Sequence, residues 1–563
     1  LEKSFHSAHR HQMFCQWRIK VKSNNFLNSF SFYCQKQCLF SSQEKCNNKN
    51  KYLPDEDGIV RSEFQSVPIQ SEPFTETLLN RIRQFSAEQP KRAIFVDAEN
   101  PSNITTFGQF LSKTHSAAHF LNSIGFSSGD VACVILPNCW HFFAIFLAAS
   151  MHKACISPVS TLLNEVELAR IFNETKCKVV FCADSLLERI LATRPLCPHL
   201  KYVVLISTTN CQSAVSLPNS QFQSVFHWSD AVGSSNSVDL SRPLPKIDVE
   251  KDVMFMPFSS GTTGLQKGVM LSHRNVGTIH LENQMLRKME PNWDWSKEHI
   301  MLHLPFYHVY GFVLGLNSLL CGGSGVVFGR FDLDLFCRTV QNYQVKVAFL
   351  VPPILVLLAK SAAPSRYDLS SLKLIMTGAA PQICQGYGMT EQSVVDIESR
   401  KPLGVGQKGE ICTRSPTTML GYLNRAEATA ETIDEDGWLR TGDIGFFDEN
   451  GRTFVVDRLK ELIKVKGFQV APAELEDLLL SHAGIKDCAV VGVADELAGE
   501  VPKAFVVRAD QTLTESELKR FVREKVASYK QLGSVEFVDE IPKSASGKIL
   551  RRVLREKDTK KSP

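Results

Sequence analysis

The chain has 563 residues, more than one hydrophobic core usually holds, so two or more domains are expected. With 44% hydrophobic residues, 22% charged residues and a net charge of +4, its composition is that of a globular protein and excludes a wholly disordered or fibrous one. The near-balanced charge, with no concentrated basic face, gives no indication of a nucleic-acid partner. The 16 cysteines include no C-x-x-C pair, which favours reduced thiols in an intracellular protein.

Residues 1–57 stand apart, and we interpret them as a disordered tail or a transit peptide. No acidic residue lies strictly between positions 3 and 43, and the part that starts at Met13 is basic and rich in serine, as mitochondrial transit peptides are. Because the chain starts with Leu1, a fragment or an imperfect gene model is an alternative explanation. Residues 560–563 read K-K-S-P and are not the Ser-Lys-Leu peroxisomal signal, so mitochondrion, peroxisome and cytoplasm all stay open.

From residue 58 onward the pattern alternates between helices and strands. Apolar periodicity predicts helices at 107–124 and 140–151. Short continuous apolar runs predict parallel strands covered on both faces, and they lie at 131–136, 178–182, 202–206 and 347–351.

Two other stretches of this part carry less regular signals. The apolar runs 142–149 and 312–328 are too short, or too interrupted by Gly and Asn, to span a membrane. Residues 207–245 are rich in Ser and Asn and predict a loop-rich connection. We therefore expect a large α/β domain with several sheets over residues 58–457.

Near Asp457 the character of the sequence changes, and we expect a smaller, mobile α+β domain over residues 458–563. Its predicted elements are helices at 473–481 and 516–527 and strands at 487–493, 503–507 and 535–538.

The string S-S-G-T-T-G-L-Q-K-G at 259–268 is the most informative motif. It lies between two apolar runs, which places it on a turn between two short strands. Glycines let backbone N–H groups turn toward phosphate oxygens, hydroxyls add donors, and Lys267 supplies a countercharge. The G-x-x-x-x-G-K-[ST] spacing is absent, so this is not a Walker A loop. The sequence therefore predicts a loop that closes over a polyphosphate.

Two further strings suit a nucleotide. In Q-G-Y-G-M-T-E at 385–391, Tyr387 offers a ring to stack on a base, Thr390 a hydroxyl for phosphate, and Glu391 an oxygen ligand for Mg²⁺. Upstream, T-G-A-A-P at 377–381 ends a strand with small residues, which leaves room for a flat ligand.

Four more strings complete the set. G-W-L-R-T-G-D at 437–443 presents Asp443 in a tight Gly turn, where a carboxylate accepts two ribose hydroxyls. Residues 457–469 place four cations around an apolar pair and a glycine at the predicted domain boundary. Residues 542–548 put Lys548 on a small turn, and 304–311 read L-P-F-Y-H-V-Y-G.

Together these strings, with G-E-I-C-T-R at 409–414, resemble the adenylate-forming superfamily in order and spacing. This superfamily includes acyl-CoA synthetases, 4-coumarate–CoA ligases, beetle luciferases and peptide-synthetase adenylation domains. The resemblance spans roughly residues 58 to 554 and is strongest to 4-coumarate–CoA ligase-like enzymes, although Thr413 stands where isoleucine is usual.

The resemblance implies roles for individual residues. ATP and AMP binding falls to Ser259, Ser260, Gly261, Thr262, Thr263, Gly264, Lys267, Ala380, Gln385, Gly386, Tyr387, Thr390, Asp443, Arg458, Lys460 and Gln469. Catalysis falls to Lys548, which bridges the acyl carboxylate and the α-phosphate, to Lys464 in the thioester-forming state, and to His308 as an aromatic gate. CoA binding falls to Arg330, Lys466 and Gly467, the acyl pocket to Tyr310 and Gly378, and Mg²⁺ to Thr390 and Glu391.

The implied reaction has two halves, with ATP, Mg²⁺ and CoA as the required small molecules. A carboxylate attacks the α-phosphorus of ATP to give an acyl-adenylate, and CoA then displaces AMP. We hypothesise that the small domain rotates about residues 457–460 to present Lys548 and then Lys464. A luciferase-type oxygenase shares every motif, whereas a peptide-synthetase module would need a carrier domain after residue 563. Phenylpropanoid, medium-chain and long-chain acids all stay open as substrates.

The sequence departs from the superfamily pattern at two places. Between Pro381 and Gln385 lie only three residues, although a crossover between neighbouring parallel strands needs about a dozen or more. A second gap follows Glu391, where Q-S leads straight into V-V-D-I. We interpret both as skipped exons or a faulty gene model. A chain of this form is expected to fold poorly and to have little activity, so a non-catalytic product is the alternative from a different class.

Overall fold

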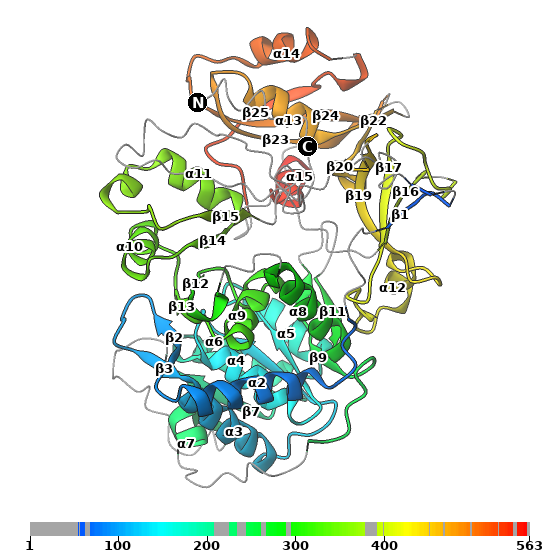
Figure 1. Ribbon diagram of the computed structural model, residues 1–563. Coiled ribbons are helices and arrows are strands. Elements are labelled where there is room, and N and C mark those ends of the chain that lie inside the picture. The colour runs from blue at the N-terminus through cyan, green and yellow to red at the C-terminus, as the bar shows by residue number, and fades with distance from the viewer. Residues whose placement is uncertain are drawn as a thin grey trace, which may run out of the picture.

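The residues described by the computed structural model (Figure 1) are 54–55, 57–61, 68–207, 224–233, 244–259, 266–288, 294–377, 391–397, 399–449, 451–465, 468–495, 498–526, 528–543 and 549–559. The N-terminal segment interpreted as a tail or transit peptide lies almost entirely outside them. The predicted fold class is confirmed, because a large α/β part with several sheets precedes a smaller α+β part at the C-terminus. In Figure 1 the orange elements of that smaller part lie together at the top, and the red helix α15 lies below them.

The largest sheet has the strand order β10-β11-β9-β5-β4-β6-β7-β8, and β18 pairs with β11 off this path. Its strands are β4 (Val131–Ile135), β5 (Cys155–Pro158), β6 (Val179–Ala183), β7 (Tyr202–Ile206), β8 (Val225–His227), β9 (Val253–Phe255), β10 (Phe258–Ser259), β11 (Lys267–Ser272) and β18 (Gly421–Tyr422). The strands from β9 to β8 are parallel, and β4 and β6 are buried throughout, as the apolar runs predicted.

Two smaller sheets continue the large part. A four-stranded sheet contains β2 (Ala93–Asp97), β3 (Ile104–Thr106), β12 (His299–Leu302) and β13 (Ser324–Val327), and a parallel pair contains β14 (Val347–Leu350) and β15 (Leu374–Thr377). A third, antiparallel sheet contains β1 (Ile59–Arg61), β16 (Glu391–Val395), β17 (Gly409–Arg414), β19 (Leu439–Phe447) and β20 (Thr453–Arg458).

Eleven of the α-helices among the described residues belong to this large part or its connections, and a twelfth belongs to the smaller part. They are α2 (Phe74–Glu88), α3 (Phe107–Ser123), α4 (His141–Ser150), α5 (Glu165–Glu174), α6 (Leu187–Thr193), α7 (Trp228–Gly233), α8 (His273–Lys288), α9 (Val309–Cys321), α10 (Leu333–Tyr343), α11 (Pro352–Lys360), α12 (Ala426–Thr432) and, at the start of the smaller part, α13 (Pro472–Leu480).

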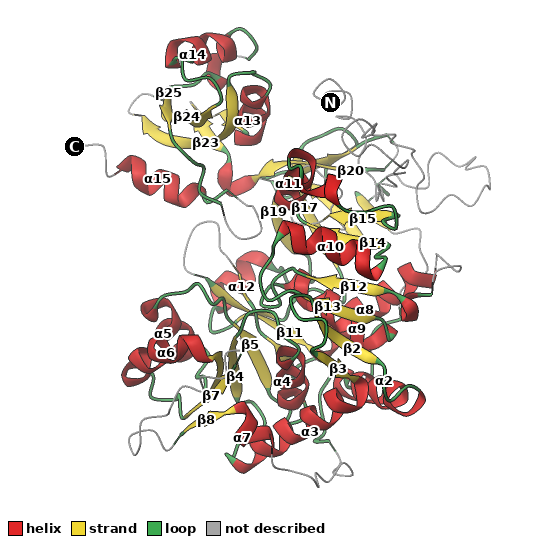
Figure 2. Ribbon diagram, turned by 90° about the vertical axis from the view of Figure 1, so that its left-hand side faces the viewer, coloured by secondary structure: helices red, strands yellow, loops and turns green. Residues whose placement is uncertain are grey.

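The smaller part surrounds a second core. Its sheet contains β21 (Ile463–Val465), β22 (Phe468–Val470), β23 (Ile485–Asp495), β24 (Gly499–Arg508) and β25 (Ser534–Phe537), and its remaining helices are α14 (Glu515–Arg523) and α15 (Arg551–Thr559). Its two clusters of buried apolar side chains contain only residues from Ile463 to Leu554, so it has a core of its own. Figure 2 shows helices on the outer faces of this sheet.

Stacked aromatic rings join the sheets of the large part. Phe255 of β9 and Phe312 of α9 lie with ring centroids 3.7 Å apart and planes 5° apart. Phe143 of α4 stacks on Phe95 of β2 with a centroid distance of 5.8 Å. Beside it, a Cβ on Gly315 would lie 1.9 Å from the Phe143 ring, so only glycine fits there. This packing fixes α4 and α9 between the nine-stranded and the four-stranded sheets.

Two predictions of secondary structure were wrong in part. Residues 207–245 contain β8 and α7, whose aromatic side chains pack into the core: Phe226 lies 5.3 Å from Phe120 and Trp228 lies 6.2 Å from Trp140, centroid to centroid. The Ser/Asn-rich composition on either side concealed them. The predicted helix 516–527 ends earlier, at Arg523, with Glu524 as its C-cap residue.

The parallel pair β14–β15 is incomplete as a sheet. Its register runs from Val347↔Leu374 to Leu350↔Thr377, and among the described residues no strand pairs with the other edge of β15. Thirteen residues, 378–390, then lead to β16 in the antiparallel sheet. The short connection noted in the sequence lies within these thirteen, outside the described residues. Isolated two-stranded sheets are only marginally stable.

Among the described residues, no helix is both long enough and apolar enough to cross a membrane.

Candidate active site

The predicted phosphate loop starts and ends on a β-hairpin. Antiparallel β10 and β11 pair Phe258 with Gly268 and Ser259 with Lys267, which confirms the predicted turn between two short strands. The Lys267 Nζ atom lies 4.8 Å from the centroid of the Tyr422 ring, on β18. The lysine side chain is therefore held at the base of the hairpin by a cation–π contact. The loop residues themselves, 260–265, lie outside the described range.

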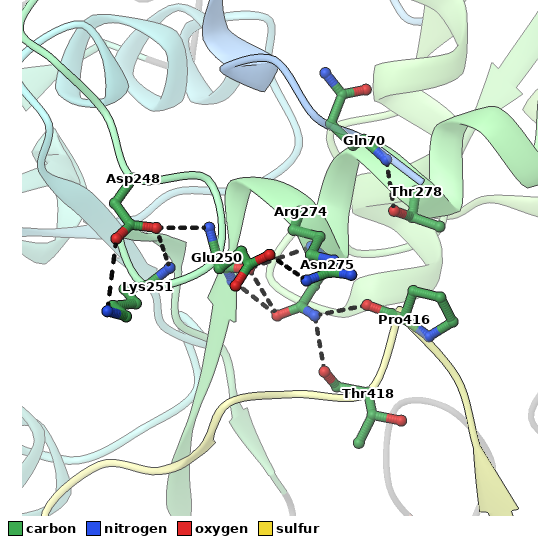
Figure 3. Close-up of polar contacts among 10 residues, drawn as sticks. Gln70, Asp248, Glu250, Lys251, Arg274, Asn275, Thr278, Pro416 and Thr418 are labelled. Carbon is green, nitrogen blue, oxygen red and sulfur yellow. Dashed lines mark hydrogen bonds and ion pairs between the residues drawn. The ribbon is translucent and has the colours of Figure 1, made fainter. Parts of the chain in front are cut away.

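A buried asparagine ties this hairpin to the antiparallel sheet (Figure 3). Asn275, only 4% exposed, accepts hydrogen bonds at Oδ1 from Ser272 N (3.0 Å) and Ser272 Oγ (3.1 Å) at the start of α8. Its Nδ2 donates to Pro416 O (2.9 Å) and Thr418 O (2.8 Å), in the loop between β17 and β18. Sequence reasoning missed Asn275, although its three-residue spacing from Ser272 is a capping signal.

Replacing Asn275 by alanine should reduce the free energy of unfolding by about 2–4 kcal/mol, because it removes the helix-capping acceptor and leaves two carbonyls without their donor. Urea unfolding measures this. Asn283→Ala on the same helix is the control. Among the described residues, Asn283 Nδ2 donates to Ile279 O in its own helix, at 2.8 Å. Its replacement should lower the free energy of unfolding by less than about 1 kcal/mol. Equal losses in the two variants would contradict the assigned clamp.

The predicted ribose residues lie opposite each other. Asp443 on β19 pairs in register with Arg458 on β20, and Asp443 is only 5% exposed. The predicted tight Gly turn lies inside the nine-residue strand β19, where the pairing with β17 shifts register between Arg440 and Ile444 while β20 pairs with Asp443 itself. Gly442, just before it, has φ +70°, a left-handed conformation that favours glycine. The strand therefore turns locally at Gly442 and presents Asp443 from a buried position.

Hydrogen bonds from β17 fix the backbone around Asp443. Gly442 N donates to Glu410 Oε1 (3.0 Å), and Asp443 N donates to Thr441 Oγ1 (3.0 Å), which itself donates to Ile411 O (2.6 Å). The other oxygen of Glu410 receives Arg400 Nη1 at 2.5 Å, and Glu410 is 3% exposed. Glu410 lies within the motif at 409–414, but sequence reasoning did not predict its hydrogen bond to Gly442. The two residues are 32 positions apart, and no local sequence pattern indicates the contact.

A second asparagine holds the segment that leads to His308. Asn138, which follows β4, donates from Nδ2 to Leu302 O (3.2 Å) and Leu304 O (2.9 Å) and accepts at Oδ1 from Phe306 N (2.9 Å). This fixes the connection between β12 and α9 from the neighbouring sheet. Sequence reasoning used Asn138 only as a strand terminator and missed this role.

His308 and Tyr310 lie at the start of α9. His308 Nδ1 accepts the backbone N–H of Tyr310 at 3.2 Å and so caps the helix. Desolvation by the surrounding protein lowers the pKa of the His308 ring. Because Nδ1 accepts the helix-capping hydrogen bond, the proton of the neutral ring is assigned to Nε2. Tyr310 is half-buried, and burial raises the pKa of its phenol.

The remaining predicted residues are placed only in part. Arg330 follows β13 and is exposed, Lys464 is exposed on β21, and Glu391 begins β16. Lys460 lies in a single 3₁₀ turn, Leu459–Glu461, and Gln469 on β22. The predicted residues outside the described range are Ser260, Gly261, Thr262, Thr263, Gly264, Gly378, Ala380, Gln385, Gly386, Tyr387, Thr390, Lys466, Gly467 and Lys548.

Thr413, the unusual residue on β17, is 1% exposed and its hydroxyl makes no hydrogen bond within the described structure. Thr413→Val should therefore raise the free energy of unfolding by about 1 kcal/mol, since it removes a buried polar group and keeps the shape. Thr114→Val on α3 is the matched control and should lower it by about 1 kcal/mol, because Thr114 Oγ1 donates to Phe110 O at 2.8 Å. Thermal unfolding of the two variants checks the opposite signs.

The described structure thus combines the β10–β11 hairpin, a buried aspartate in register with an arginine, and a smaller part with a core of its own. The sequence profile described as "AMP-binding enzyme" matches residues 82–395, and "AMP-binding enzyme C-terminal domain" matches residues 474–548. The chain belongs to the AMP-binding enzyme family, among its 4-coumarate–CoA ligase-like members.

Individual relatives agree with this assignment. The chain is 38% identical to "4-coumarate--CoA ligase 2" of Petroselinum crispum over 507 aligned positions, which cover 80% of this chain and 89% of that protein. It is 32% identical to a red-emitting luciferase of Phrixothrix hirtus, with a TM-score of 0.65 and coverage of 90% and 99%. ATP-bound MatB of Rhodopseudomonas palustris shares the fold, with a TM-score of 0.73, 23% identity and coverage of 85% and 98%.

The alignment to the parsley protein also bears on the length of the chain. The alignment is 507 positions long and includes 80% of the 563 residues of this chain, which is about 450 residues. About 57 positions of the relative are therefore aligned with gaps in this chain.

Proposed function

We propose that the protein is an ATP-dependent acyl-CoA ligase that converts a carboxylic acid into an acyl-adenylate and then into an acyl-CoA thioester. The observation that carries this proposal is the buried Asp443 in register with Arg458, because a buried carboxylate on a backbone held by hydrogen bonds is suited to accept the two hydroxyls of a ribose. The hairpin of β10 and β11 supplies the polyphosphate site on the neighbouring sheet. The 38% identity to a protein named as a 4-coumarate–CoA ligase supports the acid and thiol substrates.

The two half-reactions are balanced as follows. A carboxylate oxygen of the acid attacks the α-phosphorus of ATP, the bond from that phosphorus to the bridging oxygen breaks, and pyrophosphate leaves. The thiolate sulfur of CoA then attacks the acyl carbon, and AMP leaves with the electron pair. The protein's own contribution is alignment and charge: Lys267 at the base of the hairpin and Lys548 face negative charge that develops in the first step. Lys464 serves the second step in this proposal.

Mg²⁺ is the expected companion of ATP. Among the described residues there is no group of three or more His, Cys, Asp or Glu side chains that could hold a metal ion. Mg²⁺ bound with a nucleotide needs only one or two carboxylates, because phosphate oxygens and waters complete its shell. Glu391, at the first position of β16, and the hydroxyl of Thr390 are its proposed protein ligands. Bound there, the ion would neutralise phosphate charge.

We place the boundary between the two domains at residues 457–458. Strand β20 ends at Arg458 in the antiparallel sheet, and β21 begins a different sheet at Ile463. The 3₁₀ turn Leu459–Glu461 lies between them and supports a pivot there.

The acid is proposed to be an aromatic phenylpropanoid or a fatty acid. The experiment is a panel of cinnamic-type and fatty acids, with pyrophosphate release measured for the first half-reaction and acyl-CoA measured by chromatography for the second. Thioester formation with one class and not the other assigns the substrate. If no acid of the panel supports pyrophosphate release, the proposed function is refuted. Light emission with luciferin and oxygen would favour the luciferase-type alternative instead.

A second candidate is favoured by the gap of about 57 positions and by the two-stranded β14–β15 sheet. In this alternative the chain is a catalytically impaired splice or gene-model variant, whose adenine site and acyl pocket lack supporting structure. Sequencing the transcript across the codons for residues 380–394 separates the two. If the message encodes the missing segment, the product is the ligase; if it encodes the short form, the ligase proposal fails for this isoform.

A further inference from the structure

A buried guanidinium connects three segments of the small C-terminal part. Arg551, the first residue of α15, is 11% exposed at its side chain. Its Nη1 lies 2.5 Å from Glu461 Oε2, and its Nη2 lies 2.7 and 2.8 Å from the two oxygens of Glu476 on α13. Its Nε donates to Val490 O on β23 at 3.2 Å. The guanidinium fork therefore engages residues 90, 75 and 61 positions away.

The acids that receive the fork are themselves buried and further bonded. The Glu461 and Glu476 side chains are 9% and 10% exposed. Glu476 Oε1 also accepts Val490 N at 2.8 Å, so the carboxylate and the guanidinium bind both the N–H and the C=O of Val490. Removing one member of such a cluster leaves uncompensated buried charge, which is strongly destabilising. Lysine, with a single point charge, cannot reproduce the planar fork.

Glu461 and Arg551, which the ion pair joins, each lie close in sequence to a lysine with a predicted catalytic role. Glu461 closes the 3₁₀ turn at the proposed pivot and lies three residues before Lys464. Lys464 is itself fixed by its backbone N–H, which donates to Glu500 Oε2 at 2.8 Å. Arg551 lies three residues after Lys548, and just before it Ile549 forms a β-bridge with Lys543. One side chain thus joins the segments next to the two lysines that the two half-reactions need.

We propose that Arg551 is a positioning residue that holds the Lys464 segment and the segment after Lys548 at a fixed mutual placement, so that both half-reactions depend on it. This rests on the proposed acyl-CoA ligase function. In this proposal the effect passes through Glu461 on one side and through the start of α15 on the other. Because misplacing a catalytic group by about 1 Å costs about 100-fold, the loss of the fork is expected to slow both steps.

The experiment compares Arg551→Met, Arg551→Lys and the control Lys530→Met. Lys530 pairs with Glu474 on the same helix α13, at 2.6 Å, but on a more exposed part of its surface. Pyrophosphate release and thioester formation from supplied acyl-adenylate are measured separately. We expect Arg551→Met to slow both by about 10- to 100-fold with the KM for ATP and acid within about twofold, and Arg551→Lys to recover part of the loss. Lys530→Met should match the unmodified chain in both.

A second measurement does not depend on activity. Amide hydrogen exchange on the full chain should rise in residues 459–465 and 551–559 together in Arg551→Met, while β25 and α14 stay as protected as before. Loss of only one half-reaction, a rise in both KM values without a change in kcat, or exchange unchanged in these two segments would overturn the proposal. If the unmodified chain releases no pyrophosphate with any acid, the ligase function fails, and hydrogen exchange alone decides the role of Arg551.

Discussion

Lys548→Ala should lower the rate of acyl-adenylate formation by about 1,000-fold and leave thioester formation from supplied acyl-adenylate within about twofold. The physical reason is that negative charge builds on the α-phosphate and the attacking carboxylate only in the first step, where the proposal places Lys548. A flexible point charge is suited to meet that charge, and no comparable charge develops at phosphorus in the second step. Pyrophosphate release and acyl-CoA formation are measured in separate assays, in a chain with the relatives' segment restored if the short form is below detection.

Two other lysines sharpen this test. Lys464→Ala is expected to show the reverse pattern, with acyl-adenylate formation retained and thioester formation lost. Lys557→Ala on the exposed side of α15 removes a lysine nine residues from Lys548 and should change neither rate. If Lys548→Ala abolishes both half-reactions, the division of labour between the two lysines is wrong. That result would also make the two-step loss expected for Arg551→Met uninformative, because a lysine variant would then slow both steps as well.

Restoring the missing segment should have the largest effect on folding. Among the described residues no strand pairs with the outer edge of β15, and the thirteen residues after Thr377 must reach a different sheet. We expect a broad thermal transition with no shift on adding ATP, since binding stabilises by mass action only if the site is formed. A chimera that carries the parsley relative's segment between Thr377 and Val394 should melt cooperatively, and its midpoint should rise with ATP.

The matched control for that chimera is an insertion of the same length made of glycine and serine, which lengthens the connection but cannot form strands. It should behave as the given chain does. A cooperative melt with an ATP-dependent shift in the unmodified chain would contradict the prediction and would show that the short form holds a working nucleotide site.

The sequence patterns predicted the fold well where packing is local. Buried parallel strands have a simple signature, a short run of apolar residues, and β4, β6 and β7 lie within one residue of the predicted runs. The hairpin of β10 and β11 was predicted from the small, flexible residues between two apolar runs. The same reasoning failed for residues 225–233, because Ser/Asn-rich neighbours diluted the aromatic signal that forms β8 and α7.

The candidate site could be predicted as a set of residues but not as an arrangement. Asp443 was identified from its motif, yet its place on a strand depends on β20, which pairs with it at Arg458, and on β17, which pairs with Arg440 and Ile444 on either side of it. Asn138 and Asn275 were missed because their partners lie 141–168 residues away along the chain. No local periodicity reports such a contact. Arg551 was likewise invisible within a basic tail, where arginines are usually solvated.

The outer edge of β15 has a consequence for the behaviour of the whole molecule. It presents N–H and C=O groups that no described strand satisfies, on a strand whose Leu374 is otherwise buried. Such an edge is a template on which another chain can add a strand. A product with this edge open would therefore self-associate as its concentration rises, and inside a cell it would compete for chaperones and proteases. Its abundance, as much as its chemistry, would then report whether the short form is made.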